Sequence, residues 1–123
     1  MKPLPSFAAA ILLGSTLTAT AGPMEEAAGA EVFKRCHACH SADASKNTFG
    51  PSLTGVVGRK AASLPRFSYS DALKNSGLVW NEDNLRLWVA DNEQLVPGTR
   101  MRHVSISDRA EQDYLIAYLK SLN

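Results

Sequence analysis

Two cysteines and two histidines lie within five consecutive residues, Cys36-His37-Ala38-Cys39-His40. The step between the thiols is about one helical turn, so both sulfurs can face one side of a helix. Thiols in this arrangement can add to the two vinyl groups of a haem as thioethers, while the next residue directs an imidazole nitrogen at the iron. The C-x-x-C-H pattern is typical of c-type haem attachment.

Three other uses of these side chains stay open at this point. A dithiol redox site also has a C-x-x-C motif, but it belongs in a strand-helix-strand setting that this chain does not show. The cysteines and histidines could bind zinc, although structural zinc usually draws two ligand pairs about a dozen or more residues apart. A structural disulfide is the plainest alternative, and it leaves His40 without a role.

A candidate for a second metal ligand follows much later, in Pro97-Gly98-Thr99-Arg100-Met101. The Pro-Gly turn presents Met101 on a loop, whereas a methionine that fills a core usually lies on a helix face. His103, two residues further on, is the rival ligand, and we expect it to face solvent. The spacing therefore predicts Met101 as the ligand opposite His40.

The elements that position these residues are predicted to be helices. Apolar spacing and capping residues predict one helix over residues 25–37, a short one from Ser70 to Gly77, one from Asn81 to before Pro97, and a last one from Ser107 or Asp108 onward. Residues 41–68 are rich in Ser, Gly and Pro and predict a long loop, to which a cofactor would give something to pack against. The predicted fold class is all-α, with three principal helices plus short helices and loops.

The first 21 residues differ from the rest. Lys2 precedes a short apolar stretch, residues 7–17, and Ala19-Thr20-Ala21 has the A-x-A pattern of a cleavage site. We predict a secretory signal peptide over residues 1–21, cleaved near Ala21, and one periplasmic domain over residues 22–123. An uncleaved membrane anchor is the alternative.

Charge excludes one class of function. The chain has 13 Lys and Arg against 12 Asp and Glu, and loss of Lys2 with the signal peptide leaves a formal net charge of zero. Nucleic-acid binding normally needs a basic excess or a basic stripe. We therefore expect no nucleic-acid partner.

Several further stretches carry a resemblance to a known family. They are residues 50–60 (GPSLTGVVGRK), 67–72 (FSYSDA), Trp80, 97–101 (PGTRM) and 114–120 (YLIAYLK). In this order they resemble the class I c-type cytochromes, mitochondrial cytochrome c and its soluble bacterial relatives, over nearly all of residues 22–123. The resemblance implies the cytochrome c fold, wrapped around one covalently attached haem c.

The resemblance also implies roles for individual residues. Cys36 and Cys39 anchor the haem, while His40 and Met101 bind the iron from opposite sides. The carbonyl of Pro51 accepts the N–H of the proximal histidine, which fixes the ring orientation. Further donors are Arg59, Tyr69, Ser70 and Trp80 around the haem propionates, and Thr99 near the distal side.

Gly29 lies inside the first predicted helix, where a glycine costs about 1 kcal/mol relative to alanine. That cost indicates a close approach by another element. The resemblance implies that Gly29 and Phe33 pack against Leu115 and Tyr118 of the last helix.

Four positions depart from the family pattern. Leu73 stands where the family usually has an asparagine, Trp88 where it has a tyrosine near the methionine sulfur, and His103 where it has an aromatic residue. An indole donates but does not accept, so we expect an altered polar network and an altered reduction potential. Glu93 lies where lysines ring the exposed haem edge of the mitochondrial protein, which indicates a less basic or more apolar docking face.

The expected function is that of a soluble monohaem electron carrier that cycles between Fe(III) and Fe(II), because filled axial positions leave no site for a substrate. The expected partners are redox proteins, with a quinol-oxidising cytochrome complex or a dehydrogenase as donor and a terminal oxidase as acceptor, met by transient docking of a monomer. One alternative is a haem enzyme or gas-binding sensor, such as a weak peroxidase, in which Met101 dissociates. Another is a dedicated electron-acceptor subunit of one periplasmic dehydrogenase.

Overall fold

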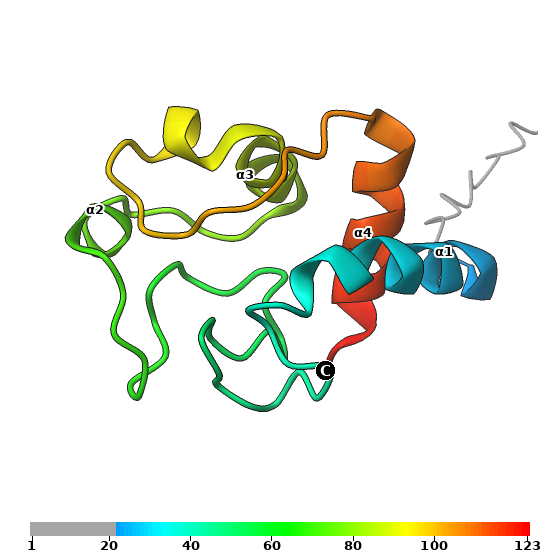
Figure 1. Ribbon diagram of the computed structural model, residues 1–123, viewed down its shortest axis with the longest axis horizontal. Helices are drawn as coiled ribbons and strands as arrows, with labels where there is room; N and C mark the ends of the chain where they lie inside the picture. The colour runs from blue at the N-terminus through cyan, green and yellow to red at the C-terminus, as the bar shows by residue number, and fades with distance from the viewer. Residues whose placement is uncertain (1–21) are drawn as a thin grey trace, which may run out of the picture.

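The computed structural model describes residues 22–123, so the predicted signal peptide lies outside the described residues. The elements, in order (Figure 1), are α1 (Pro23–Phe33), the 3-10 turn η1 (Lys34–Cys36), α2 (Asp71–Lys74), α3 (Glu82–Leu95) and α4 (Arg109–Ser121). Within residues 22–123 the only β pairing is an isolated antiparallel bridge between Lys60 and Val79. The all-α prediction is confirmed.

Side-chain caps begin the three later helices, as predicted. Ser70 Oγ accepts from the Leu73 N–H at 3.2 Å, Asn81 Oδ1 from the Asn84 N–H at 2.8 Å, and Asp108 Oδ1 from the Glu111 N–H at 2.9 Å. These oxygens satisfy backbone N–H groups that the first turn of a helix leaves without partners.

Two predicted helix ends are wrong. The first helix does not continue to His37, because it tightens into η1 at Lys34, and the His37 N–H bonds to the carbonyl three residues earlier. The short helix ends at Lys74, before the predicted stop at Gly77, which has φ of 67° and lies in the following turn.

α1 crosses α4 (Figure 1), and Gly29 of α1 lies against α4. A Cβ atom at Gly29 would lie 1.9 Å from the carbonyl oxygen of Tyr114 and 2.6 Å from the Cβ of Tyr118. The two backbones meet there because residue 29 has no side chain. Phe33, one turn later, is 1% exposed, and its ring centroid lies 5.1 Å from that of Tyr118. The predicted packing of α1 on the last helix is confirmed.

α3 is broken at Asp91, which sequence analysis missed. Asp91 has φ of −160° and ψ of 93°, which no helical residue adopts, while helix continues on both sides. The Asp91 carboxylate accepts from the N–H of Gln94 at 3.0 Å and so caps the short second part of α3.

The core is built from α1, α3, α4 and the strand-like segment before α3. Its largest members include Phe33, Trp80, Leu85, Trp88, Leu115, Ile116 and Leu119. The rings of Trp80 and Trp88 meet edge to face, with centroids 5.0 Å apart, a favoured aromatic geometry. None of the helices within residues 22–123 has the length and hydropathy needed to cross a bilayer.

Candidate functional site

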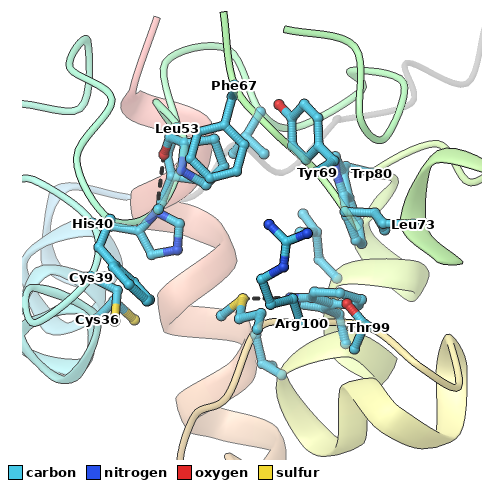
Figure 2. Close-up of a pocket in the computed structure, with 18 of the residues that line it drawn as sticks. Cys36, Cys39, His40, Leu53, Phe67, Tyr69, Leu73, Trp80, Thr99 and Arg100 are labelled. Carbon is cyan, nitrogen blue, oxygen red and sulfur yellow. Dashed lines mark hydrogen bonds between the residues drawn. The ribbon is translucent and has the colours of Figure 1, made fainter. Parts of the chain in front are cut away.

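A cavity of about 630 Å³ lies beside this core, within the range of roughly 300–1,000 Å³ that is usual for ligand pockets. Figure 2 shows Cys36, Cys39 and His40 on one side of it and Tyr69, Leu73, Trp80 and Thr99 on the other. Every residue that the sequence predicted for the site lines this cavity: Cys36, Cys39, His40, Pro51, Arg59, Tyr69, Ser70, Trp80, Thr99 and Met101.

His40 is fixed by a carbonyl behind its ring. It is 7% exposed, and its Nδ1 lies 3.0 Å from the oxygen of Pro51 (Figure 2). Because a carbonyl only accepts, Nδ1 carries the proton and Nε2 keeps its lone pair. Burial lowers the pKa of His40 below its usual value, and the bond to Pro51 opposes that shift. His40 is therefore a neutral imidazole at neutral pH, the form that binds a metal.

Gly50 lies directly against the His40 ring. A Cβ atom at Gly50 would lie 2.6 Å from His40 Cε1 and 2.8 Å from Nδ1. Gly50→Ala is expected to push the imidazole off the Pro51 carbonyl and to lower the free energy of unfolding by about 1–3 kcal/mol. Chemical denaturation of the purified protein measures this loss. An unchanged unfolding midpoint would mean that the loop moves aside without cost.

The environment of the two thiols disfavours the dithiol and zinc alternatives. Cys36 and Cys39 are both free thiols. Burial raises the pKa of Cys36, and the positive charge of nearby Arg35 opposes this rise without cancelling it. Redox-active C-x-x-C sites need a lowered thiol pKa instead. Within residues 22–123 no three His, Cys, Asp or Glu side chains are grouped so that they could hold a metal ion.

Met101 reaches the cavity from the loop that follows α3. Its Sδ accepts a hydrogen bond from the indole N–H of Trp88 at 3.3 Å, and its backbone carbonyl accepts from Asn92 Nδ2 at 2.8 Å. Trp88 is itself 6% exposed and is held by Trp80. A thioether sulfur has two lone pairs, so one remains for a metal when the indole takes the other.

His103, the rival ligand, does not line the cavity. Its Nε2 lies 3.1 Å from the carbonyl oxygen of Trp88 and its Nδ1 lies 2.9 Å from that of Val104. The expectation that His103 faces solvent is wrong, because the half-buried ring packs against α3. With both nitrogens turned to carbonyl oxygens, the ring offers no lone pair to the cavity.

Arg59 brings a positive charge to the wall of the cavity. Its guanidinium donates to the carbonyl oxygens of Thr54 and Ser52, each at 2.9 Å, and burial lowers its pKa. Among the described residues no carboxylate forms an ion pair with it. A half-buried cation that lacks a protein counter-charge indicates a ligand with an anionic end.

The other residues predicted for the site differ in the contacts that their side chains make. The hydroxyl of Ser70 already caps α2, whereas Tyr69 makes a tilted ring contact with Phe67, with centroids 4.8 Å apart. Thr99 is 2% exposed. Leu73, at the position where an asparagine was expected, is 9% exposed and gives the wall hydrocarbon instead of an amide.

Together the lining residues fit a haem. Hydrocarbon and aromatic walls suit a large apolar ring, two thiols are placed for covalent attachment, and Arg59 suits an anionic edge. A neutral imidazole nitrogen and a thioether sulfur in the same cavity are the donor set typical of the iron in c-type cytochromes.

Comparison with known proteins decides the family. A family model described as Cytochrome c matches residues 26–123. The chain belongs to the cytochrome c family. It is 41% identical to cytochrome c2 of Blastochloris viridis, over 85% of this chain and 84% of that protein. It is 47% identical to cytochrome c2 iso-2 of Magnetospirillum fulvum, over 73% of this chain and 94% of that protein.

A solved structure supports the same family. Cytochrome cH from Methylobacterium extorquens has the same fold, with a TM-score of 0.74 and 47% identity, over 78% of this chain and 97% of that one. Membership of the cytochrome c family brings one covalently bound haem c, for which Cys36 and Cys39 supply the motif. The protein is an electron carrier and not an enzyme, and its partners are redox proteins. The predicted family, fold, cofactor and general function are confirmed.

Two residues that position the site were not predicted from the sequence. Asn92 lies one turn after Trp88 and two turns after Leu85, so helical spacing places a polar side chain on the buried face of α3. An amide on an otherwise apolar helix face is the signal that could have identified Asn92. Gly50 contributes in the sequence only to the loop predicted over residues 41–68, and nothing in the sequence shows that its missing side chain makes room for His40.

Proposed function

We propose that this cytochrome c family member is an exported, monohaem electron carrier of the periplasm. Residues 1–21 would be the signal peptide, cleaved near Ala21, and residues 22–123 the cytochrome c domain. Cys36 and Cys39 would form the thioether bonds, and His40 Nε2 and Met101 Sδ would bind the iron. The observation that carries the proposal is that a neutral imidazole and a thioether, both oriented by hydrogen bonds, line one cavity.

The chemistry that the haem supplies is the gain and loss of one electron at its iron. The protein's residues keep the surroundings of that iron constant. Pro51 holds the His40 ring, and Trp88 holds the Met101 sulfur. Arg59, Tyr69, Ser70 and Trp80 would surround the propionates, and Thr99 would bond near the distal side. With His40 and Met101 both bound, no coordination position stays open for a substrate.

Covalent attachment and ligation can be tested together. The full chain is expressed with residues 1–21 in a host that matures c-type cytochromes, and the product is examined by haem staining of a denaturing gel. We expect stained protein in the periplasmic fraction and, in the oxidised spectrum, the weak far-red band typical of methionine bound to ferric haem. Stain lost on denaturation would refute covalent attachment. A missing far-red band at neutral pH would favour the sensor or peroxidase function.

The donor and acceptor need a separate test. We propose reduction by a quinol-oxidising cytochrome complex or a dehydrogenase, and oxidation by a terminal oxidase, through transient docking of the monomer. A formal net charge of zero for residues 22–123 implies that these rates depend only weakly on salt. Reduction by one periplasmic dehydrogenase, and none by a quinol-oxidising complex, would instead support a dedicated acceptor subunit.

Arg59 provides a test of the proposed propionate wall. Arg59→Leu removes a half-buried positive charge that disfavours the oxidised iron. We expect the midpoint potential to fall by about 60 mV, equivalent to about 1.4 kcal/mol for one electron. Redox titration of the holoprotein measures this midpoint potential. Arg66→Leu is the matched control because Arg66 is exposed. Equal potentials in the two variants would place the propionates elsewhere.

A further inference from the structure

The break in α3 leaves backbone carbonyl groups without helical partners. A helix has no internal donors for the carbonyls of its last turn, and the first part of α3 ends at Ala90, just before the non-helical Asp91. The carbonyls of Trp88, Val89 and Ala90 lie in the turn just before this break, where carbonyls can accept from donors outside the helix. In an unbroken helix, the N–H groups four residues later would have served.

One short segment, residues 103–106, faces all three carbonyls. Nε2 of His103 lies 3.1 Å from the oxygen of Trp88, the N–H of Ile106 donates to Val89 at 2.8 Å, and Oγ of Ser105 donates to Ala90 at 2.5 Å. This segment directly follows Met101. We call residues 97–106 the Met101 loop. Contacts at the break therefore attach the C-terminal end of this loop to α3.

The second part of α3 ties down the rest of the Met101 loop. Asn92 Nδ2 donates to the carbonyl of Met101 at 2.8 Å, and Asn92 is 7% exposed. Earlier in the loop, the N–H of Gly98 donates to the Glu93 carboxylate at 2.9 Å and the N–H of Thr99 donates to the carbonyl of Val96 at 3.1 Å. Asn92 reaches the backbone of Met101 itself from α3, and the Met101 carbonyl also accepts from Nη1 of the exposed Arg102 at 3.0 Å.

We propose that the break in α3 is a clamp that holds Met101 in its ligating position, with Asn92 as the central positioning residue. The inference rests on the proposed ligation by Met101. A methionine side chain has three rotatable bonds, so the position of its sulfur depends on how firmly its backbone is held. The buried amide of Asn92 fixes the carbonyl of Met101, and the indole of Trp88, from the turn before the break, fixes the sulfur.

Imidazole binding to the oxidised holoprotein measures how often Met101 leaves the iron, because imidazole binds only the open state. Asn92→Leu keeps a similar side-chain size and removes the donor. We expect the apparent affinity for imidazole to rise about tenfold, equivalent to about 1.4 kcal/mol. Ser105→Ala should raise the apparent affinity for imidazole by roughly threefold. Ser105 is exposed, so we expect this variant to fold like the parent protein.

Matched controls lie beside both sites. Gln94→Ala changes an exposed residue in the second part of α3, and Ser107→Ala changes an exposed serine just past the clamp. Both controls should bind imidazole like the parent protein. If Asn92 only supported the fold, Asn92→Leu would lower the unfolding midpoint and leave the imidazole affinity unchanged.

The outcomes separate this inference from the proposed function. A parent protein that has the far-red band, with Asn92→Leu and Ser105→Ala both binding imidazole like the controls, would overturn the clamp alone. A parent protein that lacks the band and already binds imidazole without competition would overturn ligation by Met101, and the clamp with it. Increased affinity in both variants, with the band retained at zero imidazole, is the expected result.

Discussion

Met101→Ala is expected to remove the far-red band of the oxidised protein and to lower its midpoint potential by on the order of 0.2 V, within the roughly 0.8 V range that axial ligands cover. A thioether is a soft ligand that favours ferrous iron, and alanine offers no donor in place of the Met101 sulfur. The same change should open the iron to imidazole and to carbon monoxide. Visible spectroscopy and redox titration of the holoprotein measure these effects.

Met24→Ala is the matched control for this experiment. Met24 is 85% exposed on α1 and does not line the cavity, so its removal should leave both the spectrum and the potential unchanged. If Met101→Ala behaved like Met24→Ala, another residue would bind the iron opposite His40. His103 is the first residue to replace in that case, although its ring nitrogens lie against carbonyl oxygens.

Gly29→Ala is expected to cost the protein much of its stability. Helix propensity alone would favour alanine by about 1 kcal/mol. The added Cβ, however, would lie 1.9 Å from the backbone oxygen of Tyr114, and a backbone atom cannot rotate aside. We therefore expect a net loss of about 2–3 kcal/mol, with a melting temperature lower by roughly 10–20 °C.

The control is Ala27→Val, which enlarges an exposed residue of α1 without approaching α4. It should shift the melting temperature of the holoprotein by only a small amount, through its lower helix propensity. Because propensity and packing act with opposite signs at Gly29, the direction of the change is decisive. A more stable Gly29→Ala protein would show that α1 and α4 do not cross as closely as described.

The helix starts could be predicted because their signals are local. Ser70, Asn81 and Asp108 cap helices through oxygens that reach only three residues along the chain, so the residue type carries the information. The haem motif is equally local, since Cys36, Cys39 and His40 lie on one turn. For these features the sequence and the structure agree.

The break in α3 could not be predicted for the opposite reason. Leu85 and Trp88 before the break and Asn92 after it keep helical spacing, so periodicity continues through Asp91. The carbonyls just before the break face His103, Ser105 and Ile106, which are about 15 residues away in sequence. The position of His103 was predicted wrongly because its partner is a carbonyl on another element.

The hydrocarbon wall of the cavity bears on the speed of electron transfer. When a centre gains or loses charge, mobile dipoles and water around it must reorient, and the energy of that reorganisation slows the transfer. Leu73 and the indole rings of Trp80 and Trp88 offer few dipoles that can turn, and Trp88 has its only N–H committed to Met101. A wall of this kind lowers the reorganisation energy, so the protein can exchange electrons quickly with partners of nearly equal potential.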